Sequence, residues 1–295
     1  MKRRTIKLSV ENFWAGYSVD NFSCYFPFLL KKYQFIADAI NPDFIIRSSF
    51  VTDRGRYRTI KHMQELPPLV QAPVIFFTGE NVSPDFEYCN WAITFRRHVD
   101  DSRHLRIPLW VPRLYELGRT PGDLLSSNFK RSSAGSHFCN FIFSNPVSQR
   151  EKLFRLISTR KRVEAPGFSM NNSKPIGSDF LDKFDFMSNY RFSIAAENVR
   201  SEGYVTEKIM EAFLSDTIPI YAGAPDVGMD FNLAAFLEID ECGGITALAD
   251  KAIWTDAEDN RRMQLAKEPV YPEDRLPECA EEGRMMAFFE SIFDR

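Results

Sequence analysis

A lysine in the segment ENVRSEGYVTEKIMEAF, residues 197–213, lies where a helix disfavours a cation. The apolar spacing of IMEAFL predicts a helix whose N-cap is Thr206 and whose first turn contains Glu207 and Lys208. Glu207 suits the positive end of the helix dipole, whereas a lysine there costs roughly 0.3–1 kcal/mol unless an anion lies nearby. Two interpretations of Lys208 follow: it pairs with Glu211 at the surface, or it binds a phosphate together with the helix amides.

A second cation, Arg150, occupies a comparable place. It follows the predicted strand FCNFIFSN (138–145) across a short loop, at the start of the predicted helix SQREKLFRLIS. A solvated helix arginine and a phosphate ligand are both open interpretations. Two cations at two strand–helix junctions of one domain would suit a diphosphate leaving group.

A metal is the usual alternative for neutralising a diphosphate, and the sequence offers no ligands for one. The chain has no DxD pair, and Asp179, Asp182 and Asp185 are interpreted as a solvated acidic face of a helix. None of the four histidines is spaced as a metal pair. We therefore predict no metal and no cofactor, so that each fixed cation stabilises the leaving group by roughly 2–4 kcal/mol in the transition state.

Glu80 is the candidate general base. It follows the predicted strand PVIFF (73–77) within the segment TGEN. A carboxylate at the carboxyl end of a strand, beside Phe76 and Phe77, suits proton abstraction, and a glutamate that stabilises a turn is the simpler alternative.

Further polar residues flank Lys208. Glu207 could accept hydrogen bonds from ribose or sugar hydroxyls, or merely complement the helix dipole. Asn198 and Tyr204 lie in the loop before the helix and could bind phosphate or ribose, and Glu197 could brace that loop from within.

Alternating strand and helix patterns explain why these side chains would meet. The first series predicts the strands TIKLSV, DFIIRSS, PVIFF, YCNWAITF and RIPLWV, with helical spacing in residues 26–40. The second predicts strands at 138–145, 190–196 and 217–221 and helices at 147–158, 179–189, 206–215, 244–254 and 279–293. In open parallel sheets, ligands bind at the carboxyl ends of strands and against helix N-termini, which is where Lys208 falls.

The polar stretch 116–136 is the best linker candidate. We predict an α/β fold of two Rossmann-like domains facing a cleft, the GT-B architecture of nucleotide-sugar transferases, although the fold alone does not decide the function. The expected domains are residues 1–130, which carry the base and bind the acceptor, and 131–270, which bind the nucleotide. A helix in residues 271–295 could pack back on the first domain.

Composition excludes several classes of protein. The 295 residues carry a formal net charge of −3, which argues against a nucleic-acid binder. Five scattered cysteines without a CxxC pair indicate a reducing compartment. No apolar run reaches the roughly 18 residues that span a bilayer. The basic start, KRR, allows at most peripheral membrane contact, so we expect a cytoplasmic protein, free or at the inner face of the membrane.

Three segments resemble a known family. FSIAAENVRSEGYVTEKIMEAFLSDTIPIYAGAPDV (192–227) resembles the signature of the α-1,3/α-1,4-fucosyltransferases, especially the bacterial ones. FFTGENVSPDF (76–86), followed by YCNWAITF and RHLRIPLW, is a second match, and FIFSNPVSQR (141–150) is a third. The matches occur in the family's order across most of residues 70–240.

The resemblance implies a GT-B enzyme that uses GDP-L-fucose and inverts the anomeric centre in a single displacement. Carried over residue by residue, Glu80 matches the general base, and Arg150 and Lys208 match the cations on the diphosphate. The donor-binding positions of the family match Asn198, Tyr204 and Glu207, the last as a catalytic residue that orients hydroxyls. The implied acceptor is a GlcNAc hydroxyl of an N-acetyllactosamine-type oligosaccharide or glycoconjugate, and the linkage α-1,3 or α-1,4.

The chain also departs from the family pattern. RVEAPGF replaces a glycine-rich stretch in the second domain, and the end of the chain is short and acidic, without heptad repeats or a basic tail. Loops 51–66 and 96–104 are candidates for acceptor contact. Two alternatives stay open: an inverting transferase with another GDP-sugar or acceptor, and a non-catalytic nucleotide-sugar or glycan-binding protein.

Overall fold

The computed structural model describes residues 3–53, 55–69, 72–177 and 179–295 of the chain, apart from the side chain of Phe180. These residues fall into two units. The first comprises Met1–Pro121 and Glu278–Arg295, and the second comprises Gly122–Pro277.

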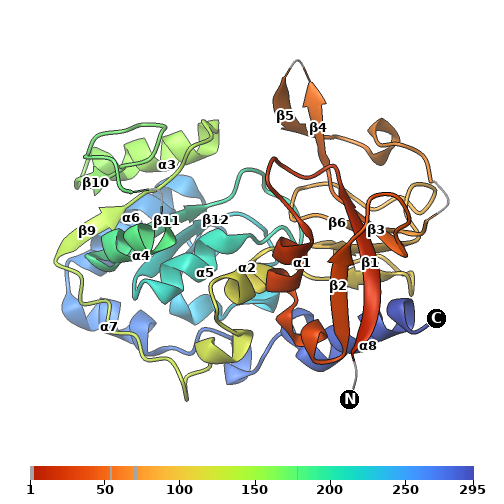
Figure 1. Ribbon diagram of the computed structural model, residues 1–295. Coiled ribbons are helices and arrows are strands. Elements are labelled where there is room, and N and C mark those ends of the chain that lie inside the picture. The colour runs from red at the N-terminus through yellow and green to blue at the C-terminus, as the bar shows by residue number, and fades with distance from the viewer. Residues whose placement is uncertain (1–2, 54, 70–71, 178) are drawn as a thin grey trace. The chain divides into compact units, whose positions relative to one another are not determined.

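The first unit is built on a six-stranded parallel sheet with the strand order β2-β1-β3-β6-β7-β8 (Figure 1). The predicted first strand is confirmed, with Ile6 and Leu8 buried on one face of β1. An antiparallel hairpin, β4-β5, follows β3. The strands are β1 (Arg4–Glu11), β2 (Tyr33–Ala37), β3 (Phe44–Arg47), β4 (Phe50–Asp53), β5 (Arg56–Thr59), β6 (Val74–Phe77), β7 (Trp91–Thr94) and β8 (His104–Arg106); the helices are α1 (Val19–Tyr25), α2 (Trp110–Glu116) and α8 (Glu282–Phe293), with 3₁₀ turns η1 (Pro27–Lys31), η2 (Met63–Glu65) and η7 (Glu278–Ala280).

The terminal helix α8 packs against this first sheet unit, beside β1 and β2 (Figure 1). Apolar residues at helical spacing form its buried face, and the ring of Phe289 lies 5.1 Å from Phe26 and 6.0 Å from Phe22. Lys32 adds ion pairs to Glu290 at 2.7 Å and to Asp294 at 2.6 Å. The last residues of the chain therefore complete the core of the first unit.

The prediction of a helix over residues 26–40 is wrong. The segment forms the short 3₁₀ turn η1 and then the strand β2, which pairs in parallel with β1. The segment YQFIA also fits the two-residue period of a strand, with Tyr33 buried beside exposed Gln34. Pairing with β1 decides between two patterns that the short sequence allows equally. RIPLWV likewise leaves the sheet after Arg106, because Pro108 has no N–H to donate to a ladder.

The second unit contains a five-stranded parallel sheet with the order β10-β9-β11-β12-β13. The central strands β11 and β12 are almost wholly buried, as expected where both faces of a parallel sheet are covered. α5 packs on both of them, and α3 contacts α6. Its strands are β9 (His137–Asn140), β10 (Val163–Glu164), β11 (Tyr190–Ala196), β12 (Ile218–Ala222) and β13 (Leu237–Glu238); its helices are α3 (Ser148–Ser158), α4 (Phe180–Ser188), α5 (Glu207–Leu214), α6 (Ile245–Asp256) and α7 (Asp259–Lys267), and its 3₁₀ turns are η4 (Val227–Met229), η5 (Leu233–Ala235) and η6 (Pro272–Asp274), with η3 (Pro121–Leu124) at its start.

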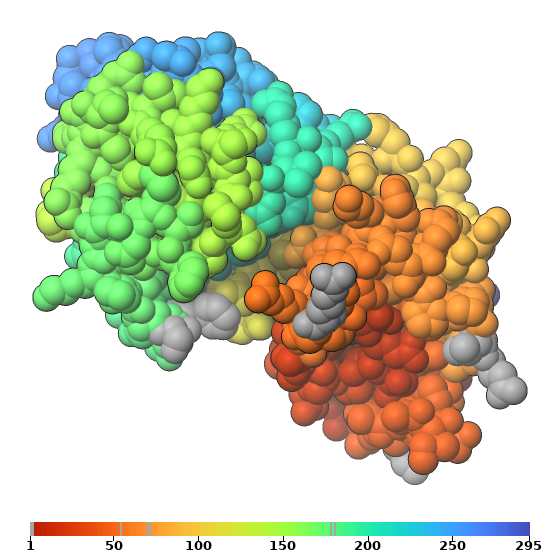
Figure 2. All heavy atoms as spheres, turned by 90° about the horizontal axis from the view of Figure 1, so that it is seen from above, coloured from red at the N-terminus to blue at the C-terminus, as the bar shows by residue number. Residues whose placement is uncertain are grey.

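Figure 2 shows α3 and the segment that follows it, in yellow-green and green, as one exposed side of this second unit. Within the unit, the predicted helices over 147–158, 179–189 and 206–215 are confirmed. The predicted strand over 138–145 is shorter than expected, since β9 ends at Asn140.

A buried carboxylate ties the end of α6 to the sheet. Asp256, whose side chain is 1% exposed, accepts hydrogen bonds from Arg191 on β11 at 2.7 and 3.1 Å and from Lys161 before β10. Burial raises the pKa of Asp256, but the hydrogen bonds from Arg191 and Lys161 outweigh it and hold the pKa below its usual range.

Asp256→Asn should lower the free energy of unfolding by about 3–5 kcal/mol at neutral pH, because Arg191 and Lys161 lose their common carboxylate. Since the folded state depresses the pKa of Asp256, this stabilisation is present above the unfolded pKa of about 3.9 and is lost as the pH falls below it. Urea unfolding at pH 7 and at about pH 3.5 measures the effect. A difference between wild type and variant that stays constant across this range would contradict it.

Candidate functional site

The loop between β11 and α5 is organised around the carboxylate of Glu197, the first residue after β11. Its side chain is fully buried and accepts hydrogen bonds from the Thr206 amide at 2.8 Å and from the Thr206 hydroxyl at 2.7 and 2.9 Å. The predicted bracing role of Glu197 is confirmed. Thr206 is the N-cap of α5 as expected, but its hydroxyl bonds to Glu197 and does not cap the helix.

Lys208 is held in the first turn of α5 by carboxylates. Its Nζ lies 3.1 Å from Glu197, 3.3 Å from Glu207 and 2.7 Å from the Thr206 hydroxyl. Burial alone would lower the pKa of Lys208, but Glu197 and Glu207 outweigh it and raise the pKa above its ordinary value. Lys208 is therefore a charged, positioned cation at a helix N-terminus.

Glu207 is also charged, and the surface pair suggested for Lys208 does not form. Burial would raise the pKa of Glu207, but the lysines Lys208 and Lys183 lower it to about 2. Glu211, the suggested partner of Lys208, is ion-paired with Lys183 instead. The interpretation of Lys208 as a lysine paired with Glu211 is thus wrong.

Arg150 is the third residue of α3, so a cation lies in the first turn of this helix as well. The side chain is buried, and its Nε donates to the carbonyl of Ala196, the last residue of β11, at 2.8 Å. Within the residues that the structure describes, its buried Nη2 has no hydrogen-bond partner. Burial lowers the pKa of Arg150 below its ordinary value. The nearby groups Glu197, Tyr204 and Glu207 act in the opposite direction and offset part of this shift.

The structure thus brings five of the six predicted residues together at the carboxyl edge of the second sheet. Tyr204 is buried in the loop, and Asn198 is half-buried. The Oδ1 atom of Asn198 is buried and makes no hydrogen bond within the described part of the chain. Donors and acceptors for a polar ligand therefore surround Arg150 and Lys208.

The sixth predicted residue, Glu80, belongs to the first unit. It is half-buried in the loop after β6, where its N–H donates to the Thr78 hydroxyl at 3.0 Å. That hydroxyl also bonds to Ser49, after β3, at 2.7 Å. The loop that carries Glu80 is therefore fixed to its neighbour at the carboxyl edge of the first sheet.

Two further residues position the loop, and the role of Asp226 was missed from the sequence. Asp226 accepts a hydrogen bond at 2.8 Å from the amide of Gly203, which has a φ of 72°. Gly223 directly follows β12 and lies beside Glu197: a Cβ at this position would lie 2.3 Å from the Tyr221 hydroxyl and 2.6 Å from the Cγ of Glu197. The segment IYAGAPD contained the signal, since a glycine directly after a buried strand indicates a close approach.

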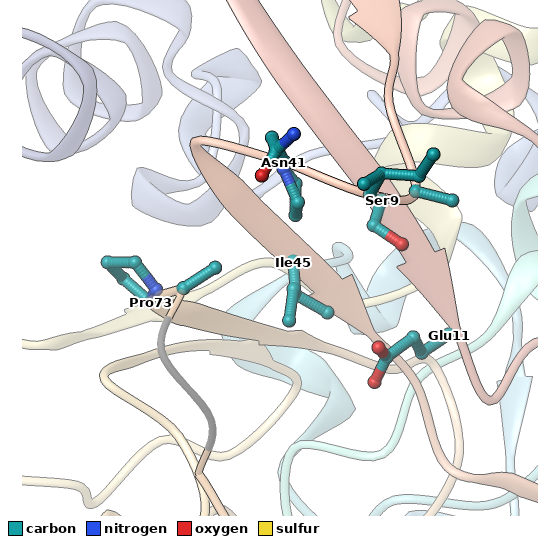
Figure 3. A pocket seen from close by; sticks show the side chains of 9 residues that line it. Ser9, Glu11, Asn41, Ile45 and Pro73 are labelled. Carbon is teal, nitrogen blue, oxygen red and sulfur yellow. The ribbon is translucent and has the colours of Figure 1, made fainter.

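A pocket of about 530 Å³ opens on the sheet of the first unit, over β1 and β3 (Figure 3). Ser9, Glu11, Asn41, Ile45 and Pro73 line it, together with their neighbours. The buried Arg47 donates two hydrogen bonds to Glu11, at 2.9 and 3.1 Å. None of the predicted site residues lines this pocket.

Among the residues that the structure describes, no group of three or more His, Cys, Asp or Glu side chains could hold a metal ion. In the same residues, no helix is both long and apolar enough to cross a membrane.

The fold is that of the glycosyltransferases with two Rossmann-like domains, and the family models place the chain in this class. A model of the N-terminal domain of the α-(1,3)-fucosyltransferase FucT matches residues 8–115, and the C-terminal model of glycosyltransferase family 10 (fucosyltransferase) matches residues 135–264. The chain belongs to this fucosyltransferase family, and the resemblance found in the sequence is confirmed.

The similar curated proteins are fucosyltransferases from several organisms. The α-(1,3)-fucosyltransferase FucT of Helicobacter pylori is 29% identical over 267 residues, which is 80% of this chain and 54% of that protein. The α-(1,3)-fucosyltransferase 7 of Mus musculus is 26% identical over 54% of this chain and 38% of its own length. The GDP-fucose protein O-fucosyltransferase 3 of Bos taurus is 27% identical over 58% of this chain and 37% of its own length. The chain thus spans about half the length of the H. pylori protein.

Solved structures confirm the fold class. A crystal structure of an α1,3-fucosyltransferase with GDP has a TM-score of 0.80 and 22% identity, with 99% of this chain and 91% of that chain covered. A structure of an α1,3-fucosyltransferase with GDP-fucose has the same TM-score and identity, with 100% and 92% covered.

Gly223→Ala should destabilise the protein by about 1–3 kcal/mol, because the added methyl displaces Tyr221 or Glu197. Gly283→Ala is the matched control: its added methyl meets no heavy atom within 4 Å, and alanine in α8 should stabilise by up to about 1 kcal/mol. Thermal unfolding distinguishes the two, and equal midpoints would mean that Gly223 does not pack as described.

Proposed function

We propose that the chain transfers L-fucose from GDP-L-fucose to a GlcNAc hydroxyl of an N-acetyllactosamine-type glycan, in α-1,3 or α-1,4 linkage and with inversion. The first domain presents the acceptor and Glu80, and the second binds the nucleotide. The family assignment supports fucosyl transfer, and the two similar structures were solved with GDP and with GDP-fucose.

One observation carries the proposal: two cations occupy the first turns of α3 and α5, beside the carboxyl ends of neighbouring strands. β9 and β11 are adjacent and parallel, so both helix N-termini lie at one edge of the sheet. Helix amides, the Nη2 of Arg150 and the Nζ of Lys208 together suit a diphosphate better than any neutral ligand.

The reaction moves one proton and one glycosyl group. Glu80 takes the proton of the acceptor hydroxyl, whose oxygen forms a bond to fucose C1. The bond from C1 to the diphosphate oxygen breaks at the same time, and GDP leaves with that electron pair. Arg150, Lys208 and the α5 amides stabilise the growing negative charge.

Lys208 can bind the diphosphate while it stays bonded to Glu197. Its contact with the buried carboxylate of Glu197 is the shorter one, at 3.1 Å, and its contact with Glu207 is 3.3 Å. A phosphate oxygen replaces Glu207 on the ammonium, and the released carboxylate accepts hydrogen bonds from ribose or fucose hydroxyls. Asn198 and Tyr204 complete the donor site in this proposal.

A different acceptor is the second candidate function. It is favoured by the similarity to a GDP-fucose protein O-fucosyltransferase of Bos taurus, whose name specifies a protein acceptor. A non-catalytic GDP-sugar-binding protein would bind GDP and transfer nothing.

Incubation with GDP-fucose and a panel of glycan and peptide acceptors, followed by linkage and anomer analysis, tests the proposal. Transfer from another GDP-sugar alone would overturn it.

Lys208→Ala and Arg150→Ala should each weaken GDP binding by about ten- to a hundredfold, the value of a hydrogen bond to a charged group. Lys152→Ala is the matched control, because Lys152 is an exposed lysine on the same helix α3. Isothermal titration with GDP measures the affinities, with EDTA present because fixed cations are proposed in place of a metal. Loss of binding in EDTA that Mn²⁺ restores would contradict the proposal.

Glu80→Gln should reduce turnover by about 10²–10⁴-fold and leave the affinity for GDP unchanged, because it removes the base and not the nucleotide site. Glu87→Gln, at an exposed position of the same loop region, should leave both unchanged. Initial rates with GDP-fucose and N-acetyllactosamine, together with GDP titration, give both quantities. Turnover near that of the wild type would remove Glu80 from the role of base.

A further inference from the structure

The loop after β1 exposes a tryptophan on a buried aromatic base. The indole of Trp14 is 42% exposed, whereas its neighbours Phe13, Tyr17 and Phe77 are buried. Of the four tryptophans in the chain, Trp91 and Trp110 are also buried. An exposed ring of this size on a well-packed support offers a ligand a rigid apolar face and a polar N–H.

The support holds the indole in one orientation. Phe13 and Tyr17 stack with their ring centres 3.7 Å apart. The indole meets Tyr17 at 5.0 Å and 75°, and Phe50 at 5.6 Å and 87°, so both contacts are edge-to-face. Asn12, with a left-handed φ of 58°, fixes the turn before it by two hydrogen bonds with the backbone of Phe50, at 2.8 and 3.0 Å.

Trp14 lies at the same edge of the first sheet as Glu80. The strands β1, β3 and β6 are consecutive and parallel, so the loops after β1 and β6 leave the same edge, about 10 Å apart at two strand spacings. Phe13 contacts Phe77, the last residue of β6, at 6.4 Å. Glu80 follows three residues later. A ligand that spans this edge could contact both residues.

The shape of the surface favours a sugar ring over a protein partner. A protein interface needs contiguous apolar surface, but around Trp14 the rings of Phe13 and Tyr17 are buried and that of Phe50 is half-buried. Among the described residues 3–35, no other large apolar side chain is strongly exposed. A sugar has one face of C–H groups, which packs on an aromatic ring, and hydroxyls at its rim, which stay in water. One rigid indole matches one such ring.

We propose that Trp14 is the acceptor platform, which stacks on a sugar ring of the acceptor and so determines which hydroxyl reaches Glu80. This inference rests on the proposed function, since it assumes a glycan acceptor at this sheet edge. Trp14 acts in it as a binding residue and takes no part in proton transfer.

Trp14→Ala should raise the KM for N-acetyllactosamine about tenfold or more, with an unchanged KM for GDP-fucose and an unchanged rate of donor hydrolysis without acceptor. Trp14→Phe should raise the acceptor KM less than Trp14→Ala does, because the smaller ring still stacks. Trp254→Ala is the matched control: Trp254 is 49% exposed on α6 of the second unit and should leave every constant unchanged. An acceptor KM unchanged in Trp14→Ala would overturn the proposal.

A binding measurement separates this proposal from the proposed function. In the Trp254→Ala background, Trp14 is the remaining exposed tryptophan among the described residues. N-acetyllactosamine should change its fluorescence, and Trp14→Phe should abolish that change. A fluorescence change without any fucosyl transfer would sink the proposed function and keep the platform. Failure of the wild type to bind N-acetyllactosamine, or an equal affinity of Trp14→Ala for it in isothermal titration, would overturn the platform while leaving fucosyl transfer to another acceptor open.

Discussion

The buried carboxylate of Glu197 is the interaction on which the arrangement of the site depends. It accepts hydrogen bonds from the amide and hydroxyl of Thr206 and from the ammonium of Lys208, and so joins the end of β11 to the start of α5. A charge with no exposed surface is stable only if its oxygens are paired and hydrogen-bonded. Glu197 therefore fixes the loop between strand and helix, and with it the place of the lysine. Gly223 is required beside it because any Cβ would occupy its space.

The charges around the two helix N-termini balance before any ligand binds. Arg150 and Lys208 supply two positive charges, and Glu197 and Glu207 supply two negative ones. This balance explains how two cations persist at the positive ends of helices, where each alone would be disfavoured. In the proposed donor site, the entering anion binds the Nη2 of Arg150 and replaces Glu207 on Lys208. Of the two carboxylates bound to Lys208, Glu207 makes the longer contact. In the proposed donor site, Glu197 therefore stays bound to Lys208 and Glu207 moves away.

The features of the site that depend on neighbours in the chain could be predicted from the sequence. A lysine in the first turn of a helix, after a buried strand, indicated an anion site without any knowledge of the fold, and the predicted helix 206–215 formed almost as expected. The confirmed role of Glu197 follows from the same junction. These features depend on neighbours in the chain, so their patterns are visible in the sequence.

Features set by distant pairing could not be predicted in this way. Residues 26–40 have the apolar spacing of a helix, yet YQFIA within them forms the edge strand β2 and pairs with β1. Lys208 prefers Glu197, eleven residues away, over Glu211, since Lys183 on α4 already holds Glu211. The cluster around Asp256 joins three separate segments. Glu80 and the residues of the second unit were predicted from separate motifs, and their joint role stays a prediction.

The most direct test is a crystal structure of the protein with GDP. The account predicts that diphosphate oxygens lie within about 2.7–3.2 Å of the Arg150 guanidinium and the Lys208 ammonium, with Lys208 still bonded to Glu197 and no longer to Glu207. A nucleotide bound elsewhere on the second unit, with Lys208 still held by both carboxylates, would contradict it.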